Sequence, residues 1–134
     1  MDTYESLIEY AALSGIMVLE EGHMTASIRM KGTCAVFMNK GEYPSQAQLS
    51  EALAHELGHC KKGAFYSLDS RRLSIKKCER IADYWSVRTL LPPNRLKDLI
   101  ENGATEVHEL AEASGRSEEF VLKAIDLYRA KGLL

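Results

Sequence analysis

The sequence of 134 residues lacks long hydrophobic runs, a strong excess of charge of either sign, and any CxxC pair. No stretch of about 18 apolar residues occurs, so we expect no transmembrane helix and no membrane function. The net charge of −2 gives no global attraction for nucleic acid or for an anionic membrane surface. The first residues carry neither the basic nor the apolar segment of a secretory signal, so we expect a cytoplasmic protein.

Cysteine is also scarce, with only Cys34, Cys60 and Cys78 present. An odd number of cysteines without paired spacing argues against a scaffold held by disulfides. We therefore expect three reduced thiols that pack as small buried apolar residues.

What the chain does contain is a succession of helical and strand-like patterns, without internal repeats or low-complexity tracts. The predicted elements are a helix at 2–13, a strand at 16–20, a hairpin with strands at 26–30 and 34–38, long helices at 45–62 and 74–91 with a polar loop at 64–73 between them, and short helices at 94–102, 105–113 and 117–131. Helices flanking a small antiparallel sheet favour an α+β fold over a βαβ arrangement.

The first long helix contains an HExxH motif, written His55-Glu56-Leu57-Gly58-His59. Each helical residue advances about 100°, so His55 and His59 lie about 40° apart and can bind one metal ion. Glu56 lies at the edge of that face, where it can take a proton from a metal-bound water as general base. The apolar residues of the helix fall on a separate stripe, so the helix has one core face and one chemical face.

A catalytic zinc site needs three protein ligands and an open position. The metzincin solution, a histidine six residues after His59, is excluded because Phe65 stands there. On the second long helix, Glu79 and Asp83 are four residues apart, so both carboxylates share one face bordered by apolar residues. Since buried charges need partners, we predict that Glu79 binds the metal and that Asp83 accepts a hydrogen bond from the far ring nitrogen of one histidine.

Several alternatives stay open. Glu79 and Asp83 also fit solvated helix charges, and the isolated His23 and His108 are weaker candidates for the third ligand. Manganese or iron would suit the same donor set as zinc. The candidate residues for stabilising an oxyanion are Tyr43, Tyr66 and His108, and the predicted strand near Cys34–Asn39 could hold a substrate as an added strand.

HELGH, followed on the second long helix by ExxAD and then by Leu90-Leu91-Pro92, resembles the ImmA/IrrE metallopeptidases over roughly residues 25–130. The resemblance implies a gluzincin-like peptidase with one zinc ion on His55, His59 and Glu79, Glu56 as base and Asp83 supporting a ligand. It also implies a cytoplasmic bacterial or prophage hydrolase that cleaves a repressor of the Xre helix-turn-helix kind. We accordingly expect a minimal zincin-like core at 1–92 and a helical C-terminal subdomain, packed on it, at 93–134.

The C-terminal segment supports a competing hypothesis, because Leu110-Ala111, Gly115 and Val121 within residues 105–131 fall at helix-turn-helix offsets. Residues 105–134 contain six acidic and four basic residues, and Glu118 and Glu119 begin the would-be recognition helix. A DNA-binding helix needs a basic footprint, so nucleic acid is not an expected partner. The alternative function is therefore a metal-bound regulator that binds a protein through this segment. The presence of Glu56 favours the enzyme, because a purely structural site has no use for a base.

Overall fold

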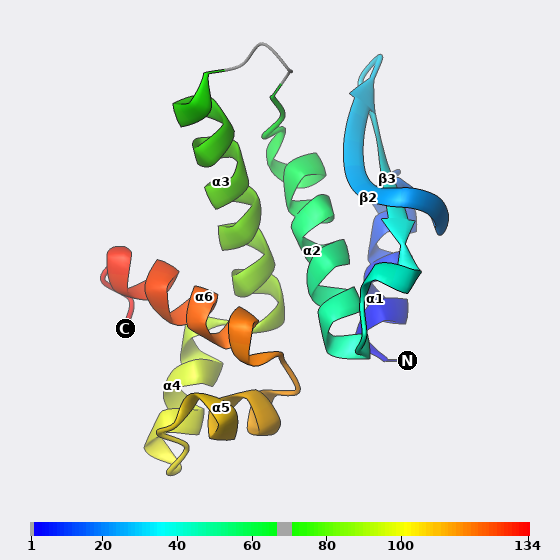
Figure 1. The fold of residues 1–134 in the computed structure, drawn as a ribbon. Coiled ribbons are helices and arrows are strands. Elements are labelled where there is room, and N and C mark those ends of the chain that lie inside the picture. The colour runs from blue at the N-terminus through cyan, green and yellow to red at the C-terminus, as the bar shows by residue number, and fades with distance from the viewer. Residues whose placement is uncertain (1, 67–70) are drawn as a thin grey trace.

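The computed structural model describes residues 2–66 and 71–134, in which a small sheet lies at one side of the molecule and the helices of the C-terminal half lie at the other (Figure 1). In chain order the elements are α1 (Thr3–Leu13), β1 (Met17–Leu19), β2 (Glu21–Met30), β3 (Thr33–Asn39), the 3-10 turn η1 (Lys40–Glu42), α2 (Gln46–Lys62), α3 (Arg72–Leu90), α4 (Pro93–Glu101), α5 (Val107–Ser114) and α6 (Glu118–Ala130). The predicted α+β class is confirmed, and each predicted helix is found within two residues of its expected ends. Of the polar loop predicted at 64–73, residues 67–70 lie outside the described residues. Within the part of the chain that the structure describes, no helix is long and apolar enough to cross a membrane.

Helix α2 has clear local signals at both ends. Ser45 precedes it, and the Ser45 hydroxyl accepts a hydrogen bond from the backbone N–H of Gln48 at 3.1 Å. At the other end Gly63 adopts φ 63°, a left-handed conformation that glycine reaches without a steric penalty. These signals fix where the helix starts and stops, and therefore where its HExxH residues lie.

The sheet is mixed, in the order β1-β3-β2, and not antiparallel as the sequence predicted. β2 pairs antiparallel with β3, but β1 pairs parallel with β3 on its other edge. The register between β2 and β3 is irregular between Glu21 and Ala26, where the chain bends across the end of β3 (Figure 1). This bend carries the chain from one edge of β3 to the other, so β1 and β2 cannot form a hairpin with each other.

Apolar side chains form two cores. The first lies between α1, the sheet and α2, and its fully buried members include Val36, Met38, Leu53 and Leu57. The second lies between the end of α3 and helices α4 to α6, and its fully buried members include Val87, Leu91, Leu96, Val121 and Tyr128. Val87 of α3 and Leu91, which directly follows α3, precede position 92 but belong to the helical C-terminal core, and the domain boundary at 92/93 stays a prediction.

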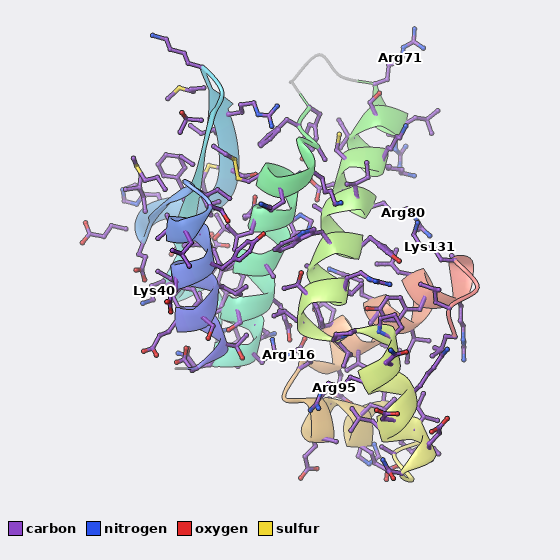
Figure 2. The ribbon with its side chains drawn as sticks, turned by 180° about the vertical axis from the view of Figure 1, so that it is seen from behind. Lys40, Arg71, Arg80, Arg95, Arg116 and Lys131 are labelled. Atoms are coloured by element: carbon purple, nitrogen blue, oxygen red, sulfur yellow. A yellow bond between two sulfur atoms is a disulfide. The ribbon has the colours of Figure 1, made fainter. Side chains whose placement is uncertain are left out.

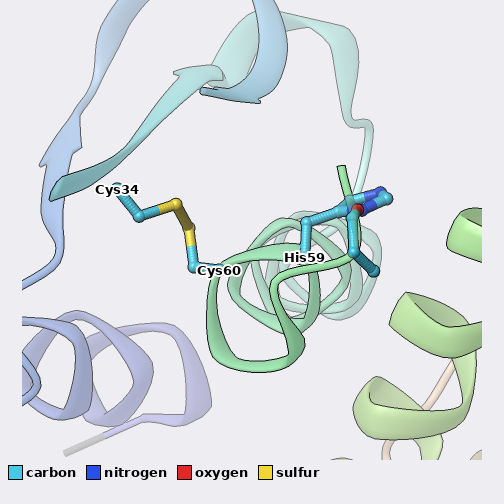
Figure 3. The surroundings of a disulfide bond; sticks show 4 residues. Cys34, His59 and Cys60 are labelled. Carbon is cyan, nitrogen blue, oxygen red and sulfur yellow. A yellow bond between two sulfur atoms is a disulfide. The ribbon is translucent and has the colours of Figure 1, made fainter. Parts of the chain in front are cut away.

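The expectation of three reduced thiols is wrong for two of the cysteines. Cys34 of β3 and Cys60 of α2 form a disulfide with their α carbons 5.7 Å apart, whereas Cys78 is free (Figure 3). Cys34 lies on the inward face of β3, where buried and partly exposed residues alternate, and Cys60 lies on the apolar stripe of α2. Packing that stripe against the strand brings the two sulfurs together, which a separation of 26 residues conceals in the sequence.

Candidate metal centre

The centre is built where α2 and α3 lie side by side (Figure 1). A β carbon on Gly58 would lie 2.7 Å from the carbonyl oxygen of Ala82, so only glycine fits at this contact. Gly58 belongs to HELGH and Ala82 to ExxAD. The small residues of the two motifs thus allow the helices to approach closely, and this approach brings their polar residues together.

The structure brings His55, His59 and Glu79 into one cluster, with one ligand atom from each residue within 4.8 Å of the others. The Nε2 atoms of the two histidines are 3.2 Å apart. One Glu79 oxygen lies 2.7 Å from Nε2 of His55, and the other lies 3.4 Å from Nε2 of His59. The predicted grouping is therefore present, and the group is close enough to hold a metal ion.

The outer nitrogens of both rings already have acceptors. Nδ1 of His55 lies 2.8 Å from a carboxylate oxygen of Asp83, and Nδ1 of His59 donates to the carbonyl of Ala64. With protons on Nδ1, both Nε2 atoms present lone pairs to each other and to the Glu79 carboxylate. In this neutral tautomer three acceptors converge on one point, and such a donor set fits a divalent metal.

Asp83 links the centre to the C-terminal helices. Lys123 of α6 donates to the same Asp83 oxygen that holds His55, at 3.2 Å. Burial alone would raise the pKa of Asp83, but its hydrogen bond with His55 and the nearby charge of Lys123 lower it below the usual value. Burial alone would likewise lower the pKa of His55, but the hydrogen bond and charge of Asp83, with Glu56 and Glu79 nearby, raise it. Asp83 thus makes the contact with the outer nitrogen of His55 that the sequence predicted for it, and its role in orienting that ring stays a prediction.

Glu56 borders two cavities that open on either side of the cluster. One of about 330 Å³ is walled on the far side by Met24–Ser27 of β2, and the other of about 310 Å³ by Tyr43 and the start of α6. Both cavities are lined by His55 and Glu56 together. Glu56 therefore lies at a place that a substrate could reach from either side, although its role as base stays a prediction.

A second tie holds α6 against the HExxH helix. The buried carboxylate of Glu51 on α2 accepts hydrogen bonds from the backbone N–H of Ser117, at 2.8 Å, and from its hydroxyl. Arg116 lies 3.9 Å from the same carboxylate and is itself largely buried. Glu51 is one helical turn before His55, so the C-terminal helices are anchored directly beside the candidate metal ligands.

Among the residues considered for the oxyanion, only Tyr66 contacts the cluster. Its hydroxyl donates to Glu79 at 2.8 Å, which raises the pKa of Tyr66. Tyr43 lines the cavity beside α6, and His108 lies exposed on α5. His23 is also exposed, and neither His23 nor His108 joins a cluster of potential ligands within the described residues.

The sequence did not predict the roles of Lys123, Glu51 or Ser117 near the centre. A lysine on an amphipathic helix and a glutamate four residues before a histidine carry no distinctive spacing.

Comparison of the chain with protein-family models, with curated proteins and with solved structures gives no match. The resemblance to ImmA/IrrE metallopeptidases therefore stays a prediction.

Proposed function

We propose that this chain is a zinc-dependent endopeptidase of the ImmA/IrrE kind, with a zincin-like core and one zinc ion held by His55, His59 and Glu79. The convergence of these three donors, with Glu56 beside them at two open cavities, is the observation that carries the proposal. Two histidines and a glutamate form one of the known ligand sets of catalytic zinc. Manganese and iron accept similar donors, so measuring the bound metal is part of the test.

When bound at these residues, zinc would polarise the peptide carbonyl and lower the pKa of a water. Glu56 would take the proton from the attacking water and pass it to the leaving amine. Asp83 would keep the His55 ring in the tautomer whose Nε2 faces the cluster. Tyr66, which donates to Glu79 at the mouth of the β2 cavity, is our candidate for a hydrogen bond to the developing oxyanion.

The substrate would bind along β2. The sequence assigned this role to the strand at Cys34–Asn39, but that strand is β3, which pairs on both sides with β1 and β2. Its backbone groups are therefore already used, and that prediction is wrong. β2 is an edge strand of the sheet, and its segment Met24–Ser27 lines the cavity that contains His55 and Glu56. An extended peptide added to this edge would pass directly over the predicted ligands.

The proposed substrate is a repressor of the Xre helix-turn-helix kind in the bacterial cytoplasm, encoded by a prophage or another mobile element. This part of the proposal rests on the resemblance of HELGH and ExxAD alone. The Cys34–Cys60 disulfide is uncommon in a cytosolic protein, so the compartment needs its own test. Alkylating the thiols of cells before lysis, and then counting modified cysteines, measures whether this bond exists in the cell.

The alternative of a regulator that acts through a helix-turn-helix-like segment gains no support from the contacts of α6. The backbone N–H of Ser117, at the start of that helix, is bonded to Glu51, and Phe120 is buried. The first turn of a recognition helix has to be free to enter the major groove. Here that turn packs against α2 and carries Glu118 and Glu119.

The decisive experiment is co-expression of the chain with candidate repressors, comparing wild type with Glu56→Gln. We expect a cleaved repressor band with wild type only, while both proteins retain one zinc ion by elemental analysis. The exposed Glu9→Gln variant is the control and should cleave like wild type. Cleavage by Glu56→Gln would exclude the proposed base, and unchanged zinc content in Glu79→Ala would place the third ligand elsewhere.

A further inference from the structure

A groove of about 590 Å³, separate from the two cavities at the metal centre, lies along α3 on the side away from the predicted metal ligands. Ile81, Tyr84 and Trp85 form its apolar wall. Its rim carries five cations, Lys62, Lys77, Arg80, Arg88 and Lys131, and none of the described acidic residues lines it. Figure 2 shows Arg80 of α3 and Lys131 at the end of α6 on the same side of the molecule, with Lys40 and Arg95 elsewhere. Neither the metal centre nor the proposed mechanism uses these residues.

In the part of the chain that the structure describes, the rim cations are exposed and lack carboxylate partners. None of the five forms an ion pair within residues 2–66 and 71–134. Two of them lie over the ring of Tyr84 instead, Lys131 at 4.3 Å and Arg88 at 5.9 Å from its centroid. Five like charges around one groove, in a chain of net charge −2, create a local positive field that attracts an anionic ligand.

The aromatic rings argue against a nucleobase as that ligand. Tyr84 carries Lys131 over its face and meets Tyr128 edge to face, with ring centroids 6.3 Å apart. Trp85 packs against Tyr10, with centroids 5.9 Å apart. Binding of single-stranded nucleic acid relies on open ring faces on which bases stack. Here the protein's own side chains already pack against these rings, so they offer no open face to a base. The cationic rim suits carboxylates instead.

The length of the groove indicates the kind of segment it fits. It follows α3 from Lys77 to Thr89, a rise of about 18 Å. This distance corresponds to about three turns of a helix or to five or six residues of an extended chain. We propose that the groove binds an acidic, amphipathic segment of a partner protein, with carboxylates on the cationic rim and apolar side chains against Ile81, Tyr84 and Trp85. The proposal does not depend on peptidase activity.

The test is selection of peptides from a random 15-residue display library on the intact, immobilised wild-type protein. We expect binders in which acidic residues alternate with apolar ones. Trp85 is the single tryptophan of the chain, so its fluorescence reports occupancy of the groove directly. Selected peptides should bind Arg80→Gln/Arg88→Gln about tenfold more weakly, because two charge-complementary contacts are lost, and this difference should shrink at high salt.

The matched control is Arg95→Gln/Lys97→Gln, which removes two exposed charges on α4 outside the groove and should bind like wild type. Basic or uncharged binders, or equal affinity for the groove variant and wild type, would overturn the proposal. So would tighter binding of a poly-dT oligonucleotide or of anionic lipid vesicles than of every selected peptide. Zinc content and cleavage are separate readouts, so failure of the peptidase proposal would leave this result unaffected.

Discussion

Gly58 and Ala82 touch so closely that a β carbon on residue 58 would lie 2.7 Å from the carbonyl oxygen of Ala82. Each residue belongs to one of the two motifs that supply the candidate ligands. Because the contact on the Ala82 side is made by backbone atoms, a side-chain rotation cannot relieve it, and one of the two helices would have to shift as a whole. The positions of His55 and His59 relative to Glu79 therefore depend on Gly58, which has no functional side chain.

Gly58→Ala should separate α2 from α3. Overpacking of this kind costs about 1–3 kcal/mol of unfolding free energy. We expect that loss, together with a zinc affinity at least about tenfold weaker, because ligand geometry is shared between the helices. Denaturant unfolding and competition with a zinc-binding dye measure the two effects. Gly41→Ala is the control, since a β carbon there meets only one atom, 3.5 Å away. A Gly58→Ala protein with unchanged zinc affinity would show that the helix contact does not set the site.

The parts of the site that could be predicted are those encoded by spacing within one helix. HExxH and ExxAD place side chains at positions four apart, and helical geometry alone then sets their shared faces. The contributions of Lys123, Glu51 and Ser117 depend on how separate elements pack, and the spacing of residues in the sequence does not encode that packing. The same reason explains the errors in the sheet: pairing of β1 with β3 and the Cys34–Cys60 bond are both contacts between segments distant in sequence.

Metal affinity should fall as the pH is lowered. The pKa of His55 is raised: burial acts to lower it, but the Asp83 hydrogen bond and nearby carboxylates outweigh burial. In the metal-free protein the folded state binds this proton more tightly than the unfolded state does. The shift therefore stabilises the fold fully at pH values below 6.5, the ordinary histidine pKa, and the stabilisation is lost as the pH rises through the raised pKa. Zinc needs the neutral ring, so binding must release this proton below the raised pKa. Calorimetric titrations at several pH values, in buffers of different ionisation enthalpy, measure the proton released.

Asp83→Asn tests the cause of that pH dependence. Removing the carboxylate lowers the pKa of His55, so the fall in zinc affinity should begin at a lower pH than in wild type. At high pH the variant should bind zinc about 10–100-fold more weakly, because the His55 ring is less well oriented. The exposed Asp98→Asn variant should match wild type at every pH. An unshifted pH profile in Asp83→Asn would mean that another group holds the proton.

Glu51→Ala should loosen the C-terminal helices from α2. The change removes the acceptor for both Ser117 bonds and leaves the buried Arg116 without its nearest carboxylate. Leaving a buried charge unpaired costs about 3–5 kcal/mol. We expect a loss of this size in unfolding free energy, together with faster amide exchange at the start of α6. Glu9→Ala, which removes an exposed carboxylate on α1, is the control. A loss below about 1 kcal/mol, the range of surface pairs, would contradict the anchoring role of Glu51.

Breaking the Cys34–Cys60 bond should reduce stability. The bond closes a loop of 26 residues, and cross-links over loops of this size stabilise by about 3–4 kcal/mol in the chain-entropy model. Urea unfolding of wild type with and without reductant should show that difference, and Cys34→Ala/Cys60→Ala should behave like the reduced protein. Cys78→Ala keeps the bond and should respond to reductant as wild type does. His59 and Cys60 project from α2 in different directions (Figure 3), as neighbouring residues about 100° apart on a helix do, so the double variant should still bind one zinc ion per chain. Three titratable thiols in the unfolded, unreduced protein would show that the bond does not form.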